Sequence, residues 1–369
     1  MSSKVYYASM RADNKNENLV NKLSRLFNKA GFGEFLEEED LCAVKLHFGE
    51  AGNNAFIRPM FVRRIVEEIK SEAAKAFLTD ANTLYSGSRA NAVDHLNTAI
   101  ANGFSYATVL APLVIADGLN GKNFIEVEIE GEHFQEVKLG AEAVQADALI
   151  SLAHFKGHEL TGFGGAMKNV GMGLGSRSGK QMMHANVDPE VMAEDCIACG
   201  KCARWCAHDA IEINQIAEID YDKCVGCGEC IVTCPTDAIT LQWDSGPVAT
   251  QEKLAEFTLG AVQNKADKVG YINFVMDVSP DCDCAGWTDQ PIVNDIGILA
   301  AKDPVAIDQA SADLVNQAEG NKNSALKKNF AAGEDKFRGV HPNVDWEAQL
   351  KHGAKIGLGS REYELIKID

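Results

Sequence analysis

The chain has 369 residues, of which 46% are hydrophobic and 24% are charged, as in ordinary globular proteins, and this composition excludes a disordered chain. Its 53 acidic residues outnumber 35 lysines and arginines, so the net charge is −18. A field of this sign disfavours binding to nucleic acid or to an anionic membrane surface, and it favours docking to a basic patch on a partner protein. The length predicts about two to three domains.

The N-terminal segment MSSKVYYASMRADNKN lacks the apolar core of a signal peptide. No run in the chain approaches the ~18 apolar residues of a membrane span. We therefore expect a cytoplasmic protein whose cysteines stay reduced.

Strands and helices alternate along the first half of the chain. A strand is expected at 3–9, and the helix after it is expected to end at Gly31. A buried strand at 41–48 comes next, and Pro59 begins a second helix. This alternation predicts an α/β fold with a mostly parallel sheet covered by helices. Further elements are expected as a strand at 75–82, a helix at 89–103, an apolar segment at 107–117, an antiparallel hairpin near an edge at 123–139 and a strand at 146–156.

Eight glycines lie between residues 157 and 179. A phosphate-binding loop is excluded, because Leu174 stands where that pattern needs glycine and Gln181 follows the lysine. Two interpretations stay open. The segment is either a flexible loop over a site, which offers Lys168 and Asn169 to an anion, or a plain glycine-rich connection.

The most specific pattern is a repeated C-x-x-C-x-x-C-x-x-x-C run. Each cysteine of the second run lies 28 positions after its counterpart in the first, so the pattern is an internal repeat. Three thiolates at this spacing in a glycine-containing turn can reach three irons of one cubane, and the fourth ligand must come from elsewhere. The two runs consist of Cys196, Cys199, Cys202 and Cys206, and of Cys224, Cys227, Cys230 and Cys234.

The repeat resembles bacterial ferredoxins with two [4Fe–4S] clusters, in which the fourth cysteine of each run ligates the other cluster. The resemblance assigns Cys196, Cys199, Cys202 and Cys234 to one cluster and Cys224, Cys227, Cys230 and Cys206 to the other. Ala207 departs from the pattern, since the second run has Pro235 there. Structural zinc is the alternative, although the third and fourth cysteines of each run are superfluous for it.

After the repeat, the alternation of helices and strands resumes. A helix is expected at 252–265, a strand at 271–279, a helix that Asp303 caps and Pro304 begins, and a final helix and strand at 345–355 and 363–368. We therefore expect residues 1–189 and 245–369 to form one α/β domain, with residues 190–244 inserted as the two-cluster module.

Polar residues follow the predicted strands, where ligands of parallel α/β sheets bind. A candidate pocket is therefore expected from His47, His154, Lys156, His158, Cys282 and Cys284, with a further metal or a small ligand bound in it. Each histidine alone is also compatible with a structural role. In an extended chain Cys282 and Cys284 would face the same side, which favours a metal or redox role, whereas Asp281 and Asp283 would oppose thiolate formation.

The chain resembles a known family through HFKGHELTGFGGAMKNVGMG, the cysteine repeat and DCDCAGWTDQPIVNDIGILAAKDPVAID. It is similar to the uncharacterised iron–sulfur centre proteins with domain of unknown function 362. The resemblance implies an α/β domain with a two-cluster module, and it implies no particular reaction.

The expected function is electron transfer from two [4Fe–4S] clusters to a ligand or metal in the α/β pocket, as in a ferredoxin-type oxidoreductase. The partners expected are an electron donor or acceptor protein and a small-molecule substrate. Two alternatives stay open. The protein is a non-enzymatic redox sensor or electron carrier that docks a partner, or an enzyme whose clusters are structural.

Overall fold

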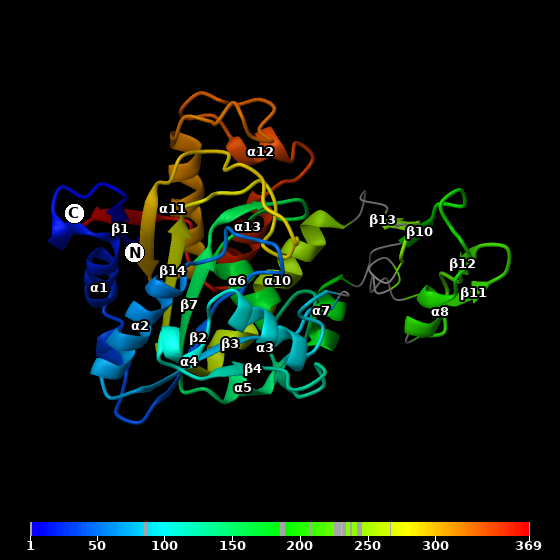
Figure 1. Cartoon of the computed structure of the whole chain (residues 1–369), viewed down its shortest axis with the longest axis horizontal. Coiled ribbons are helices and arrows are strands. Elements are labelled where there is room, and N and C mark those ends of the chain that lie inside the picture. The colour runs from blue at the N-terminus through cyan, green and yellow to red at the C-terminus, as the bar shows by residue number, and fades with distance from the viewer. Residues whose placement is uncertain are drawn as a thin grey trace.

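A computed structural model describes residues 2–84, 87–184, 189–206, 208–224, 230, 234–236, 238–241, 246–265 and 267–368. Most of the described chain builds one α/β body (Figure 1). The described residues between 189 and 241 form a smaller cysteine-rich module to one side of that body. Cys227 lies outside the described residues.

An eight-stranded sheet organises the body, in the order β16-β1-β15-β14-β7-β2-β3-β4. Within it β15 is antiparallel to both of its neighbours, and the other neighbouring pairs are parallel. The predicted α/β class with a mostly parallel sheet is therefore confirmed. The strands are Ser3–Ser9 (β1), Leu41–Lys45 (β2), Lys75–Asp80 (β3), Leu113–Ile115 (β4), Ala148–His154 (β7), Val269–Val275 (β14), Gly297–Ala301 (β15) and Tyr363–Lys367 (β16).

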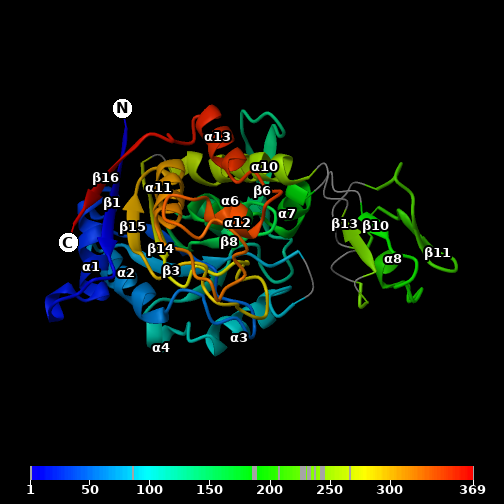
Figure 2. The same ribbon diagram turned by 90° about the horizontal axis from the view of Figure 1, so that it is seen from above.

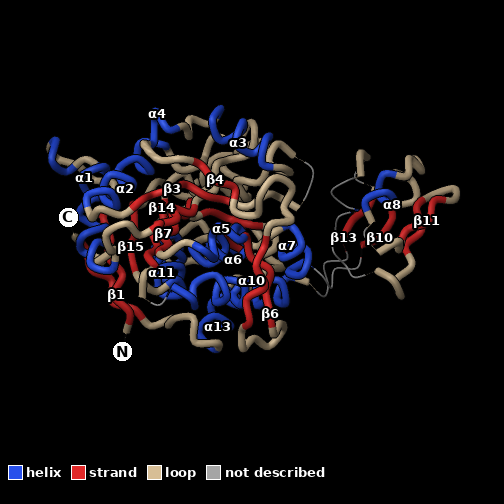
Figure 3. Tube along the Cα trace, turned by 90° about the horizontal axis from the view of Figure 1, so that it is seen from below, coloured by secondary structure: helices blue, strands red, loops and turns tan. Residues whose placement is uncertain are grey.

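Helices cover both faces of this sheet (Figures 2 and 3). Alternate side chains of β14 enter different layers: Tyr271 packs in one hydrophobic cluster and Ile272 in the other. One layer contains α1 (Leu19–Lys29), α2 (Pro59–Ser71), α3 (Ala92–Ala101) and α4 (Tyr106–Val109). The other contains α6 (Ala166–Leu174), α7 (Arg177–His184), α10 (Pro247–Val262), α11 (Pro304–Gln317), α12 (Lys336–Val340) and α13 (Glu347–Lys355), and α5 (Ala141–Gln145) leads into β7.

The glycine-rich segment forms an antiparallel pair of short strands, β8 (Lys156–His158) and β9 (Gly162–Gly164), followed by α6 and the start of α7, so it is not a flexible loop. Gly171 in α6 faces α10, where an added Cβ would lie 2.3 Å from the carbonyl oxygen of Leu254 and 2.5 Å from Oγ1 of Thr258. Gly171 therefore allows close packing between α6 and α10. The hairpin forms from β5 (Phe124–Glu128) and β6 (Glu136–Gly140), but as a separate two-stranded sheet.

The module is held by two small antiparallel pairs. Its strands β10 (Pro189–Val191) and β13 (Ile239–Leu241) pair with each other, and so do β11 (Ile211–Ile213) and β12 (Ala217–Ile219). A short helix, α8 (Lys201–Trp205), follows Cys199 and carries Cys202. Strand β7 precedes the module in the chain and β14 follows it, yet the two are neighbours in the main sheet.

Candidate functional site

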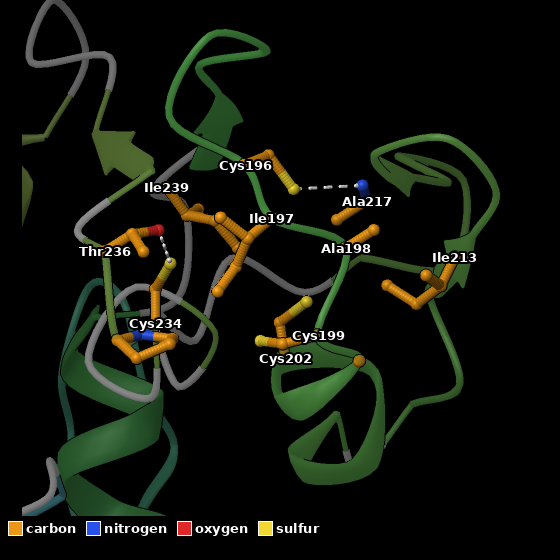
Figure 4. A pocket seen from close by; sticks show the side chains of 12 residues that line it. Cys196, Ile197, Ala198, Cys199, Cys202, Ile213, Ala217, Cys234, Thr236 and Ile239 are labelled. Atoms are coloured by element: carbon orange, nitrogen blue, oxygen red, sulfur yellow. Dashed lines mark hydrogen bonds between the residues drawn. The ribbon is translucent and has the colours of Figure 1, made fainter.

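Four cysteines of the module line one cavity (Figure 4). Cys196, Cys199 and Cys202 come from the first run, and Cys234 comes from the second. The cavity measures about 300 Å³ with its open mouth, and aliphatic side chains such as Ile239 complete its lining. The structure thus brings together the four thiols expected to bind one cluster. The donor set and the space between the thiols fit a thiolate-bound metal cluster.

Backbone N–H groups point at sulfur atoms of this module. The N–H of Ala217 donates to Sγ of Cys196 at 3.4 Å, and the N–H of Ala210 donates to Sγ of Cys206 at 3.3 Å. Such donors stabilise negative charge on thiolates and on bound clusters. These two N–H groups therefore lie where they can donate to the sulfur atoms of a bound cluster.

Cys234 has the environment of a thiolate. Burial raises its pKa, but the backbone N–H and the hydroxyl of Thr236 outweigh this effect, so the pKa of Cys234 is lowered. Oγ1 of Thr236 lies 3.6 Å from the Cys234 sulfur. By contrast, burial raises the pKa of Cys202, and the neighbouring Cys199 adds to that increase. A bound cation would offset this cost by stabilising the deprotonated thiol.

The other expected ligand set is described only in part. Cys206 and Cys224 are partly buried, and Cys230 lies in the small core of the module. Cys227 falls outside the described residues. The assignment of these four to a second cluster stays a prediction.

Cys282 and Cys284 meet in the α/β body, and their Sγ atoms lie 3.1 Å apart. The segment is a turn and not the extended chain that the sequence analysis assumed, because the N–H of Ala285 donates to the carbonyl oxygen of Cys282. Cys282 is buried and Cys284 is partly exposed. The turn, and not strand alternation, places the two thiols together.

A lysine and a histidine complete this pair. Nζ of Lys168, on α6, lies 3.1 Å from Sγ of Cys282, and Nε2 of His47 lies 3.6 Å from Sγ of Cys284. The N–H of Gly49 donates to Nδ1 of His47, so neutral His47 carries its hydrogen on Nε2. Cys282, Cys284, Lys168 and His47 are called the paired-thiol site below.

The charges at this site favour a thiolate on Cys282. Its hydrogen bond with Cys284 lowers the pKa of Cys282, and burial raises it. The positive charges of Lys168 and Lys156 also lower it, so the pKa of Cys282 falls to about 5. The pKa of Cys284 is raised, first by the hydrogen bond with Cys282 and then by burial. Burial, together with the charge of Arg89, lowers the pKa of His47 to about 4, so this ring is neutral near pH 7.

Asp283, between the two cysteines, is neutralised by cations. Its carboxylate lies 2.8 Å from Nδ1 of His154 and 3.3 Å from Nζ of Lys156. Nε2 of His154 lies 3.0 and 3.1 Å from the carbonyl oxygens of Met276 and Asp277. The repulsion that the sequence suggested is therefore compensated, and His154 and Lys156 lie behind the thiols as partners of Asp283.

His158 lies beside the paired-thiol site. Its Nδ1 accepts hydrogen bonds from the N–H groups of Leu160 and Thr161, at 3.1 and 3.2 Å. Burial, with a smaller contribution from Lys168, lowers the pKa of His158 to about 4. The neutral ring therefore presents Nε2–H as a donor.

A second buried charge network lies at the ends of β2 and β3. Nζ of Lys45 lies 3.0 Å from Oδ1 of Asp80 and donates to Oδ1 of Asn169 at 2.9 Å. Arg89 joins this network, 3.6 Å from Asp80 and 3.0 Å from Glu50. Asn169 thus ties α6 to the sheet, and it does not lie open to an anion as expected. The sequence offered no signal for Arg89.

A histidine pair with a carboxylate also lies in the body, formed by His133, Glu256 and His352. The Glu256 carboxylate accepts from Nε2 of His352 at 3.0 Å and from the N–H groups of Glu132, His133 and Phe134. These bonds occupy the carboxylate and anchor the hairpin of β5 and β6 to α10. The group is therefore explained by the fold.

The fold and the cysteine cavity define a mostly parallel α/β protein that carries a cysteine-rich module. The domain of unknown function family DUF362 matches residues 42–313, so the chain belongs to this family. No curated protein matches the chain. In the part of the chain that the structure describes, no helix is both long and apolar enough to cross a membrane.

Two solved structures are similar in outline. The lactate racemase apoprotein from Thermoanaerobacterium thermosaccharolyticum is 12% identical, with a TM-score of 0.43 over 86% of this chain and 58% of that one. A protein from Thermotoga maritima is 9% identical, with a TM-score of 0.41 over 92% of this chain and 59% of that one. The chain therefore spans less than two thirds of either structure.

Proposed function

We propose that this protein is an iron–sulfur electron-transfer protein. Cys196, Cys199, Cys202 and Cys234 hold one [4Fe–4S] cluster, and the other four cysteines of the repeat hold a second. When bound, such clusters supply single electrons at potentials that their surroundings set. The electrons are used at the paired-thiol site of the α/β body, where a small molecule is reduced.

The observation that carries the proposal is the composition of the cavity in the module. Three thiols of one run and the last thiol of the other run line the same cavity. This is the crosswise sharing that two-cluster ferredoxins use. The N–H donors to Cys196 and Cys206 supply the second support, because hydrogen bonds to sulfur stabilise anionic clusters.

Anaerobic purification with iron, sulfide and zinc analysis tests the proposal. We expect roughly eight irons and eight sulfides per chain, since each cubane holds four of each. Reduction with dithionite should give the electron paramagnetic resonance signal of reduced cubanes. About two zinc ions per chain with no iron would refute the proposal.

Cys234→Ser tests the crosswise assignment. The variant should hold between about four and about seven irons, because a cubane that lacks one thiolate loses one iron or all four. Cys42→Ala is the matched control, since Cys42 lies in the core of the body, away from both thiol groups. It should keep the full iron content. An unchanged iron count in Cys234→Ser would contradict the assignment.

A second candidate function is an electron carrier or redox sensor that docks a protein partner. Large apolar side chains of the module are exposed, among them Ile197 by 65% and Trp205 by 54%. Ile197 also lines the cysteine cavity, so a partner bound there would approach a cluster closely. This candidate predicts that cluster reduction leaves the redox state of Cys282 and Cys284 unchanged, whereas the first candidate predicts that it changes.

A further inference from the structure

We infer that Cys282 and Cys284 form a dithiol–disulfide couple that reduces low-molecular-weight disulfides, with Cys282 as the attacking thiolate and Cys284 as the resolving thiol. The inference deepens the proposed function, and it rests on that function only for the supply of electrons that resets the couple.

The geometry places the two sulfurs within reach of each other. Their separation of 3.1 Å requires only a small approach to form a bond, and the turn closed by Ala285 already holds both side chains on one side. A dithiol whose sulfur atoms are in contact is prepared for intramolecular exchange.

The surroundings distinguish the two thiols. Nζ of Lys168 donates to Cys282 at 3.1 Å, and this positive charge stabilises a thiolate there. The hydrogen between the two sulfurs then belongs to Cys284, which makes Cys284 the protonated member. Asp283 between the cysteines opposes this charge, but its close contacts with His154 and Lys156 reduce the effect.

The reaction balances in three steps. The Cys282 thiolate attacks one sulfur of the substrate disulfide, forms a mixed disulfide and releases the first half as a thiolate, which water protonates. Cys284 loses its proton to water and attacks Cys282, so the second half leaves and a Cys282–Cys284 disulfide forms. Two electrons, supplied through the proposed clusters, and one proton to Cys284 then restore the starting state.

The burial of the site limits the size of the substrate. Cys282 is only 5% exposed, so the disulfide of a folded protein does not reach its sulfur without displacing the turn. Cys284 is partly exposed and opens the site to solvent on its side. A small, flexible disulfide of the glutathione type fits these constraints.

Peptide mapping measures the couple directly. The full-length protein is equilibrated with mixtures of reduced and oxidised glutathione, quenched in acid, alkylated after denaturation and digested with trypsin. The peptide 269–302 carries Cys282, Cys284 and no other cysteine, and the peptide 30–45 carries Cys42 alone. We expect 269–302 to lose both alkyl groups together as the oxidised fraction rises, while 30–45 stays alkylated.

Single variants test the roles of the two thiols. With oxidised glutathione, Cys284→Ser should form the mixed disulfide on Cys282 at least about tenfold faster than Cys282→Ser forms it on Cys284, since one pKa unit changes the thiolate fraction about tenfold. The reverse order would overturn the roles. A peptide 269–302 that keeps both alkyl groups at every glutathione ratio would overturn the couple itself.

These outcomes are separable from the test of the proposed function. If the protein contains no iron but Cys282 and Cys284 still interconvert between dithiol and disulfide, the electron-transfer proposal is refuted and the dithiol–disulfide couple is supported. If the protein contains roughly eight irons but Cys282 and Cys284 never form a disulfide, the couple is refuted and the electron-transfer proposal is supported.

Discussion

Nζ of Lys168 lies 3.1 Å from Sγ of Cys282, although the two residues are 114 positions apart in the chain. The contact depends on the placement of α6, whose first N–H groups, those of Ala166 and Met167, donate to the carboxylate of Asp308 on α11 at 2.7 and 2.9 Å. A carboxylate at a helix N-terminus is stabilising. Packing between two helices thus positions the cation that faces the thiol.

Replacing Lys168 by methionine should make Cys282 less reactive. One of the positive charges that lower the Cys282 pKa is lost, so the pKa rises towards the ordinary value of 9.0 and the pH at which half of the thiol is ionised moves upward. The alkylation rate of peptide 269–302 by iodoacetamide, measured against pH, reports this change. Lys122→Met, at an exposed position, is the control. Equal rates in both variants would rule out this role for Lys168.

The same contact makes stability depend on pH. Because the folded protein lowers the Cys282 pKa, its thiolate contributes to the free energy of unfolding above the ordinary thiol pKa. That contribution is lost as the pH falls from 9.0 through the lowered value. Denaturant unfolding between pH 9 and pH 5 should show a smaller pH dependence in Lys168→Met than in the unaltered protein.

Asp283→Asn should destabilise the fold strongly. Asp283 is fully buried, and its loss leaves His154 and Lys156 without their counter-charge, at a cost of about 3–5 kcal/mol in the free energy of unfolding. Asp277→Asn is the control, because its pair with Arg58 is exposed and should contribute under about 1 kcal/mol. Urea unfolding measures both. Equal effects would contradict the role of Asp283 as the buried partner of His154 and Lys156.

Gly157→Ala should disturb the segment that leads to the paired thiols. An added Cβ would lie 2.1 Å from the carbonyl oxygen of Pro280, and this backbone must move to accommodate it. We expect a loss of about 1–3 kcal/mol in the free energy of unfolding. Gly246→Ala, whose added Cβ meets nothing within 4 Å, is the control. A loss no larger than in the control would show that this close approach is dispensable.

Replacing residues 189–241 by a short glycine–serine linker should leave the body folded. Pro189 and Leu241 are direct partners in the antiparallel pair of β10 and β13, so the two chain ends lie about 5 Å apart. The shortened protein should unfold in one cooperative transition, bind no iron and retain the exchange chemistry of peptide 269–302. An insoluble or unfolded product would contradict the prediction that the module is an insertion.

The fold could be predicted from the sequence where local spacing carries the information. Alternating strands and helices predicted the α/β class, and Asp303 caps α11 through the N–H groups of Val305 and Ala306, as expected. The prediction for 157–179 failed, because glycines that allow close approach of neighbouring strands and helices resemble glycines that allow flexibility. Strand β15 was also missed, because this short antiparallel strand of five buried residues has no alternating pattern to reveal it.

By itself, the sequence determined which cysteines can act as one group, because the distances between ligands in a tight turn follow from their spacing along the chain. It also placed reactive side chains at the ends of strands, since parallel strands align these ends at one edge. Only the tertiary structure decided that Lys168 faces Cys282 and that Asp283 is neutralised. These contacts arise from packing between elements more than a hundred residues apart, and no local pattern encodes them.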